Sequence, residues 1–264
     1  SKKVKLDYLF LTGLLLCIFF QGSKIYPYTF LAPVEVLKSE TNSSEASLSV
    51  YTANVLQKNK ERDKIVQSID ERNPDIILLT ETHNEWRNYI LDKYGKKYPY
   101  KEIAPFENTY GMMLLSKYAL HDSRITFLVE DTIPSIQSKI VLPFRDTIQL
   151  IAIHPTPPVP TESPTSVDRD AELMKVAFIV KKTKLPVIVM GDFNDVAWSE
   201  TTELFQEVSG LLDMRKGRGL YNTYNANIPV LRWPLDHIFI SPGFEVVSIE
   251  KGEHIGSDHF PFYT

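Results

Sequence analysis

The sequence of 264 residues contains a single cysteine, Cys17, and no excess of positive charge. One thiol excludes an internal disulfide framework and any zinc site built from several cysteines. The 29 Lys and Arg residues are outnumbered by 33 Asp and Glu residues, which gives a net charge of -4. Dedicated nucleic-acid-binding proteins usually carry a basic excess, because phosphate neutralisation supplies most of their non-specific affinity. The composition disfavours a dedicated nucleic-acid-binding protein, but it does not exclude a local basic cleft.

The N-terminal segment lacks the length of a standard membrane span. Residues 8–20 carry no charge, but a full span needs roughly 20 apolar residues. Three lysines precede this run, no A-x-A cleavage pattern follows it, and its apolar residues lie on every helical face. We expect residues 1–24 to be membrane-associated or signal-like, with the basic end in the cytoplasm and the remainder outside. A helix buried in a soluble domain is the alternative. Because Ser1 is not Met, we also expect residues upstream.

No internal repeat is detectable, and the apolar content of 43% is enough to bury a substantial core. A chain of this length folds as one large domain or two small ones. Pro27 and Pro33 break any helix after the N-terminal segment, and residues 38–47 are polar and Ser-rich. We therefore expect a connector over residues 25–46 and the main domain over residues 47–264.

Within the main domain, apolar runs alternate with segments of helical periodicity. The unbroken apolar run from Pro186 to Met190 is typical of a strand buried on both faces. Helices are expected at residues 62–72, around 86–93, at 168–181 and from 199 to 210. Strands are expected at residues 48–54, 75–81, 111–115, 133–142, 147–153, 186–190, 235–240, 244–249 and 260–263. Two sheets packed face to face, with helices outside, would satisfy these buried strands.

Polar side chains follow several of these apolar runs. Those at the C-terminal edges are Asn54, Glu81, His154, and Asp192 with Asn194. Asp236 begins a further strand, and Asp258 and His259 immediately precede the last one. Any one of them could be an ordinary loop residue, but a packed sheet brings such strand ends together. The pattern therefore predicts a site at one sheet edge.

The order of these residues resembles the endonuclease/exonuclease/phosphatase (deoxyribonuclease-like) superfamily. The elements that carry the resemblance are Asn54, Glu81, His154, Gly191-Asp192-Phe193-Asn194, Asp236 and Gly256-Ser257-Asp258-His259. It extends over residues 47–264, which it identifies as a catalytic domain. It implies an α/β four-layer sandwich, with two facing mixed β-sheets flanked by helices. The prolines after His154 and the stretch 232–237 look like a bacterial membrane-linked branch.

The expected chemistry is metal-dependent hydrolysis of a phosphate ester. Hard oxygen ligands without cysteine suit Mg²⁺ or Mn²⁺, and the expected metal ligands are Glu81, assisted by Asn54 and Asp258. Such a cation would neutralise the phosphoryl oxygens. The structural alternative for Glu81 is a carboxylate that caps a helix.

The remaining residues are expected to bind substrate and move protons. Asp192 and Asn194 would orient the attacking water and a phosphate oxygen. His259 would act as acid and base, with Asp236 fixing its tautomer. His154 would donate to the phosphate, so Asn54, His154 and Asn194 form the substrate-binding set. For His154 and His259, the alternative is a histidine with a purely structural role. His237 is expected to be structural because it follows Asp236 in a strand and faces the other side.

Two classes of function stay open. The first is a phosphodiester hydrolase acting on nucleic acid, a phospholipid head group or a soluble ester, since one fold can host all of these substrates. The second is a catalytically silent membrane-linked binding or scaffold domain, which the complete residue set argues against. No obligate protein partner is evident. Membrane association would place the catalytic domain outside the cytoplasm.

Overall fold

Two six-stranded sheets form the centre of the domain. The structure, a computed structural model, describes residues 2–40, 47–143, 146–159 and 162–264. The first sheet has the order β11 (Glu250–Lys251), β12 (Phe262–Tyr263), β1 (Val50–Asn54), β2 (Ile76–Thr80), β4 (Met112–Ser116), β3 (Tyr100–Ala104). The second has the order β5 (Leu120–Phe127), β6 (Pro134–Val141), β7 (Thr147–Ile153), β8 (Val187–Asp192), β10 (Asp236–Ile240), β9 (Leu212–Asp213).

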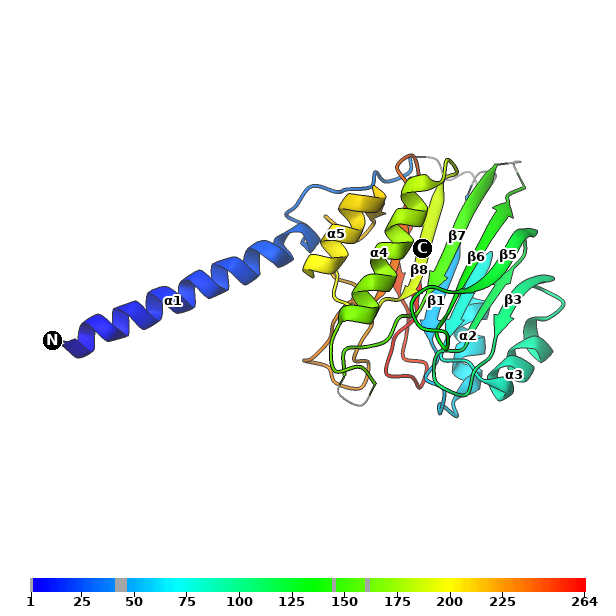
Figure 1. The fold of residues 1–264 in the computed structure, drawn as a ribbon, viewed down its shortest axis with the longest axis horizontal. Coiled ribbons are helices and arrows are strands. Elements are labelled where there is room, and N and C mark those ends of the chain that lie inside the picture. Colours follow the sequence, from blue (N-terminus) through cyan, green and yellow to red (C-terminus); the bar gives the residue numbers. More distant parts are fainter. Residues whose placement is uncertain (1, 41–46, 144–145, 160–161) are drawn as a thin grey trace.

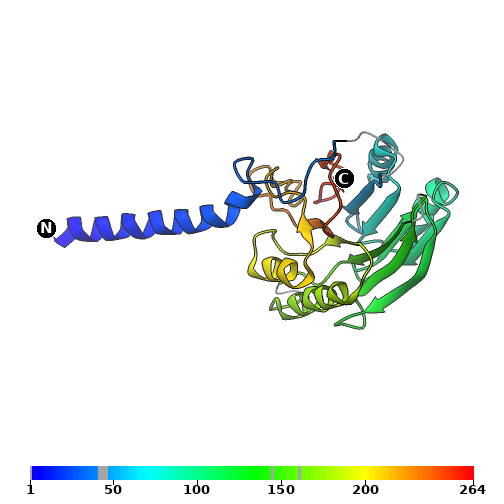
Figure 2. The same cartoon turned by 90° about the horizontal axis from the view of Figure 1, so that it is seen from above.

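Helices cover the outer face of each sheet (Figures 1 and 2). Helices α2 (Arg62–Arg72) and α3 (Asn84–Tyr94) pack on the first sheet, and α4 (Val167–Lys182) and α5 (Glu200–Ser209) pack on the second. A third apolar cluster fills the space between the two sheets. The expected α/β four-layer sandwich is confirmed.

The unbroken apolar runs follow from burial on both faces of a strand. In β2, Leu78 belongs to the cluster between the sheets, whereas Ile77 and Leu79 pack toward the helices. All five residues of this strand are buried. Because alternate side chains point to opposite faces, a strand in the middle of four layers needs apolar residues at every position.

Strand directions bring the polar ends of the strands to one edge. Strand β1 runs parallel to β2, and β7 runs parallel to β8, so each pair ends on the same side. Strand β10 is antiparallel to β8, and its first residue, Asp236, lies opposite Asp192. The start of β10 and the ends of β7 and β8 therefore meet.

Gly191 permits a close approach between β7 and β8. Its φ is 142°, and a Cβ atom there would lie 2.0 Å from the carbonyl oxygen of Ile153. No side chain fits in this space or readily adopts this φ. The glycine thus brings Asp192 next to the end of β7, where His154 follows.

The predicted strand over residues 244–249 is wrong. Val246 instead donates its N–H to the carbonyl of Leu37 and accepts from the N–H of Ser39. This segment is thus held by the chain that precedes the domain, and only Glu250–Lys251 joins the sheet. Strands β3 and β5 were not expected, because they are partly exposed and carry charged residues among their apolar ones.

Helix α1 (Lys2–Ile25) projects away from the domain, as Figures 1 and 2 show. Within the segment Lys5–Tyr28, a window of 18 residues has a mean hydropathy of 1.5, and no residue of that window is buried. It is long and apolar enough to cross a membrane by length and composition, as a signal sequence also would be. The helix is longer than the uncharged run alone indicated. Its exposure rules out the alternative of a helix buried in the domain.

The expected connector lies partly on the domain. Tyr28 is buried, and its hydroxyl donates to the carbonyl of Ala197. The carboxylate of Glu35 accepts from the backbone N–H of Asp213 and pairs with Lys216 at 2.9 Å. Part of the polar stretch 38–47, residues 41–46, lies outside the described residues, as do residues 160–161 of the proline-rich loop.

A buried carboxyl in α4 makes the stability depend on pH. The Glu172 carboxylate accepts a hydrogen bond from Ser135 Oγ at 3.1 Å, and burial raises its pKa from 4.5 to about 7. The folded state therefore binds a proton that the unfolded chain has released, so stability falls as pH rises from 4.5 through 7. We expect Glu172→Gln to flatten this decline and to stabilise the protein at pH 8 by about 3 kcal/mol.

Urea unfolding at pH 5 and pH 8 measures this effect. The matched control is Glu207→Gln, which removes an exposed carboxylate on α5 and should leave the pH dependence unchanged. If Glu172→Gln kept the pH dependence of the wild type, another group would be responsible for it.

Candidate active site

Six of the predicted residues meet at the sheet edge. Asn54 and Asp192 are the last residues of β1 and β8, Glu81 and His154 follow β2 and β7, and Asp236 begins β10. His259 arrives from the turn before β12. Each side chain is thus positioned by a strand end, and both sheets contribute.

Asn54 connects the acids of the two sheets. Its Nδ2 donates to Glu81 Oε1 at 2.8 Å and to Asp192 Oδ2 at 3.0 Å. Its Oδ1 accepts from the backbone N–H of Leu56 at 3.0 Å. Since Asn54 is buried, its amide holds the two carboxylates on either side of it.

His259 lies between two buried carboxylates. Its Nδ1 is 2.7 Å from Asp236 Oδ2, and its Nε2 is 3.5 Å from Asp192 Oδ2. Ligand atoms of these three residues lie within 4.8 Å of one another. Such a chain fixes the ring orientation and the position of each proton.

The pKa values of His259, Asp236 and Asp192 follow from their burial and from their closeness to one another. Burial lowers the pKa of His259, but Asp236 and Asp192 outweigh it and raise the pKa to about 10. Burial raises the pKa of Asp236 above its usual value despite the nearby His259. For Asp192 the opposing effect of the two histidines prevails over burial, and its pKa falls. Asp192 is therefore the carboxylate that this site keeps ionised.

His154 approaches the same carboxylate from β7. Its Nε2 lies 3.8 Å from Asp192 Oδ2, and its ring is 5.4 Å from that of Tyr110 between centroids. Its buried Nδ1 has no hydrogen-bond partner among the described residues. A buried polar atom without a partner is costly, and it suits a residue that binds something else.

Glu81 makes no helix cap. The residue before α3 is His83, whereas Glu81 Oε2 accepts from the backbone N–H of Gln57 at 3.1 Å. Burial raises the pKa of Glu81, and His154, Asn54, Gln57 and His259 only partly offset it. Apart from the two imidazoles, its neighbours are neutral donors. Within the described part of the chain, this carboxylate therefore forms no ion pair, and its cationic neighbours are the two imidazoles.

Asn194 and Asp258 lie beside the central cluster. Asn194 Nδ2 donates to the carbonyl of Pro155 at 2.9 Å, and its N–H donates to Asp192 Oδ1 at 3.0 Å. Asp258 is half-buried, within reach of Ser257 Oγ at 3.4 Å, and it contributes to the raised pKa of His259. The structure thus places Asn194 as a support for Asp192 and the loop after His154.

The comparison with known families agrees with this geometry. The model described as "Endonuclease/Exonuclease/phosphatase family" matches residues 51–259, which include all eight predicted site residues. The chain belongs to this family. No significant match is found among curated protein sequences.

Solved structures share the endonuclease/exonuclease/phosphatase fold. A Staphylococcus aureus beta toxin variant with bound magnesium ions has a TM-score of 0.63 and 18% identity, over 83% of this chain and 99% of that one. D. rerio TDP2 complexed with a single-strand DNA product has a TM-score of 0.65 and 16% identity, over 82% and 97%. A family protein from Leptotrichia buccalis has a TM-score of 0.62 and 16% identity, over 82% and 98%. At these identities the similarity shows the fold.

Sequence reasoning missed the residues that support this family site. Ser257 Oγ donates to the Asn54 carbonyl at 2.8 Å and accepts from the His259 N–H at 3.1 Å. Thr223 Oγ1 accepts from the N–H of Asp236 at 3.1 Å. The Ser-Asp-His motif contained the signal for Ser257. Nothing in the sequence pattern distinguishes Thr223 from other loop residues.

Arg169 and His237 have supporting positions in this family member. Arg169 donates to the Asn194 carbonyl at 2.8 Å and pairs with Asp195 at 3.3 Å. His237 lies on the far face of β10, as expected, with Nε2 2.9 Å from the Asp195 carbonyl oxygen. Burial lowers its pKa to about 3. His237 is therefore a neutral structural residue.

Proposed function

We propose that this protein is a divalent-metal-dependent phosphodiester hydrolase, with residues 47–264 as its catalytic domain. The observation that carries the proposal is the continuous chain from Asn54 through Asp192 to His259 and Asp236. It joins an amide, two carboxylates and an imidazole at the edge of both sheets. Membership of the endonuclease/exonuclease/phosphatase family supports the same chemistry.

In the proposed mechanism, Asp192 orients the attacking water. Asn54 and the Asn194 N–H fix its two oxygens, so its position is set before substrate binds. His154 donates to a phosphoryl oxygen, and Asn54 and Asn194 complete the substrate-binding set. His259, held at Nδ1 by Asp236, takes the proton that the attacking water releases as its oxygen bonds to phosphorus. The phosphorus–oxygen bond to the leaving group breaks, and the leaving oxygen takes a proton from solvent. Preorganised donors of this kind stabilise the charge that develops in the transition state.

The donor set at Glu81 fits a hard divalent cation. Its half-buried carboxylate has a raised pKa and forms no ion pair among the described residues, whereas the close Asp192, Asp236 and His259 group already contains the imidazole as its cation. Glu81, with Asn54 and Asp258, would hold Mg²⁺ or Mn²⁺. When bound, the ion would supply charge neutralisation on the phosphoryl oxygens.

The surroundings favour a small ester or a lipid head group over nucleic acid. Glu107, Glu130 and Glu162 line a cavity of about 390 Å³ that also contains Tyr110, whose ring contacts His154. Three carboxylates beside the site repel a polyanion more strongly than a compact or zwitterionic substrate. The helix α1 supports attachment to a membrane with the catalytic domain outside the cytoplasm.

A substrate panel tests the proposal. Purified protein with Mg²⁺ or Mn²⁺ is assayed on bis(p-nitrophenyl) phosphate, on plasmid DNA and on phospholipid vesicles. We expect hydrolysis of the small diester and faster turnover of vesicles than of plasmid. Inactivity of the folded protein on all three would instead favour the catalytically silent membrane-linked binding or scaffold domain.

The metal requirement gives a separate prediction. We expect EDTA to abolish hydrolysis and Mg²⁺ to restore it. For Glu81→Gln, the Mg²⁺ concentration giving half-maximal rate should rise at least about tenfold, because second-shell changes alone cost that much and a lost ligand costs more. Titration of initial rates with Mg²⁺ measures this shift, with the exposed Glu85→Gln as control. An unchanged Mg²⁺ requirement would remove Glu81 from the metal site.

A further inference from the structure

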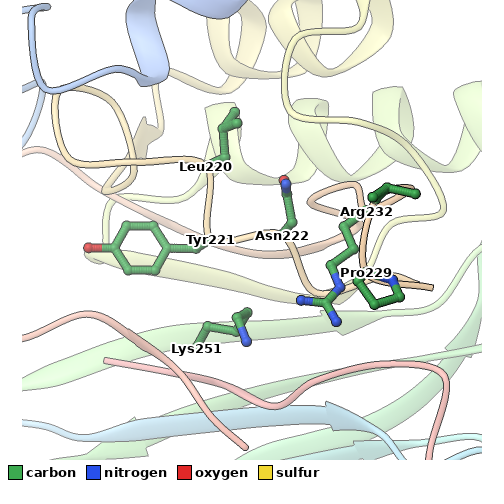
Figure 3. Close-up of a pocket in the computed structure, with 7 residues that line it drawn as sticks. Leu220, Tyr221, Asn222, Pro229, Arg232 and Lys251 are labelled. Atoms are coloured by element: carbon green, nitrogen blue, oxygen red, sulfur yellow. The ribbon is translucent and has the colours of Figure 1, made fainter. Parts of the chain in front are cut away.

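A second cavity lies in the loop between β9 and β10. It has a volume of about 590 Å³ and is lined by residues of this loop together with Lys251. Figure 3 shows Arg232 and Lys251 extending toward the same space, with Asn222 above them. None of the proposed catalytic residues lines it. The cavity is therefore a separate feature of the surface.

Two cations share one aromatic ring at this cavity. The Arg232 guanidinium carbon lies 4.8 Å from the centroid of Phe260, and Lys251 Nζ lies 3.5 Å from the same centroid. Neither forms an ion pair within the part of the chain that the structure describes. Burial and the nearby Arg232 lower the pKa of Lys251. The Glu253 carboxylate partly offsets this lowering of the Lys251 pKa, but it forms no ion pair with either cation. Two like charges held together leave a position that an anion would stabilise.

The hydrogen-bonding atoms of the cavity are also incompletely used. Arg232 Nε is buried and has no hydrogen-bond partner among the residues that the structure describes, and the outer nitrogen Nη2 donates to the Ala226 carbonyl at 3.3 Å. The side chain of Asn222 also lines the cavity, and its amide Nδ2 is a hydrogen-bond donor. A guanidinium fork matches the oxygens of a phosphate group, and an ammonium adds a point charge. The chemistry thus fits a phosphate.

The tip of the same loop is apolar and exposed. Val230 is 87% exposed, Leu231 50% and Ile228 42%. Single exposed apolar residues are normal, but a cluster of them marks an interaction surface. Apolar side chains beside basic ones are the combination that binds the interface of an anionic membrane.

This loop lies close to the C-terminal end of α1, where the helix joins the domain. In the first part of this loop, the N–H of Gly217 donates to the carbonyl of Pro27, and Arg218 donates to the carbonyl of Val36. The segment after α1 also exposes Phe30 at 83% and Leu31 at 68%. In Figures 1 and 2 the orange loop lies on the side of the domain from which α1 leaves. A membrane entered by α1 would therefore face this loop.

We propose that Arg232, Lys251 and Asn222 bind the phosphate of an anionic phospholipid head group in the membrane that α1 enters. Val230 and Leu231 then contact the boundary of the acyl chains. The docking loop is also connected to the active site. Trp233 forms a backbone bridge with Tyr224, and the ring of Tyr224 lies 4.9 Å from that of His259 between centroids. A docked loop holds the active site next to the lipid surface.

Fluorescence quenching of Trp233 by brominated phosphatidylglycerol tests this docking. The full chain is reconstituted into nanodiscs of phosphatidylcholine with and without the brominated lipid, and subtracting the W233F signal isolates Trp233. We expect strong quenching in the wild type. The R232Q/K251Q variant should weaken the docking equilibrium about 25-fold, since each basic residue near an anionic surface contributes roughly fivefold.

Matched variants keep the result interpretable. K181Q/K182Q removes two exposed charges at the end of α4 and should quench like the wild type. V230D changes only the exposed tip, cannot disturb the packing on Phe260, and should also lose quenching. Equal quenching in the wild type and in R232Q/K251Q would overturn the proposal. So would competition by millimolar inorganic phosphate, which would assign the pocket to a soluble phosphate.

Discussion

Asp192→Asn is expected to lower kcat for bis(p-nitrophenyl) phosphate by roughly 10³-fold, the upper end of the loss typical for one preorganised polar group. The substitution keeps the shape of the side chain, so Asn54 and the Asn194 N–H retain a neighbour of the same size. It removes the charge that the site keeps ionised between His154 and His259. Initial rates at saturating Mg²⁺ measure the effect.

Asp92→Asn is the matched control for this prediction. Asp92 is exposed on α3, away from the sheet edge, so its loss of charge should leave kcat within about twofold, as for surface substitutions elsewhere. Wild-type kcat in Asp192→Asn would show that water is oriented by another group, and the proposed mechanism would fail.

The second large effect concerns the pair of His259 and Asp236. We expect His259→Gln to lower kcat by roughly 10³-fold and Asp236→Asn by roughly 10²-fold. The double variant should be no slower than His259→Gln alone, because Asp236 acts through the imidazole 2.7 Å away. A double-mutant cycle on kcat measures this coupling.

The cycle also tests another role for Asp236. Losses that multiply in the double variant would mean that Asp236 acts independently of His259, for example as a metal ligand within the close group with Asp192. Far-ultraviolet circular dichroism on each variant checks that the buried substitutions leave the fold intact.

Local sequence pattern was sufficient to predict where the strands end. The strands β1, β2, β7 and β8 are mostly apolar because they are largely buried, so the chemically distinctive Asn54, Glu81 and His154 stand out at or just after their ends. The meeting of Asn54 with Asp192 across two sheets is a contact between distant parts of the chain. That part of the prediction came from the family resemblance.

Other features depend on tertiary contacts that no local pattern encodes. Residues 244–249 have strand composition, yet their hydrogen bonds go to the segment around Leu37 instead of a sheet neighbour. The opposition of Asp236 and Asp192 depends on the antiparallel register of β10. Arg232 and Lys251 are separated in sequence and come together only around Phe260. These could not be predicted from spacing alone.

The position of a bound cation tests the central claim most directly. Crystals of the protein soaked in MnCl₂ would locate Mn²⁺ by its anomalous scattering. We expect a peak at bonding distance from the Glu81 carboxylate, beside Asn54. A peak held by Asp192 and Asp236 without Glu81, or no peak at this sheet edge, would contradict it.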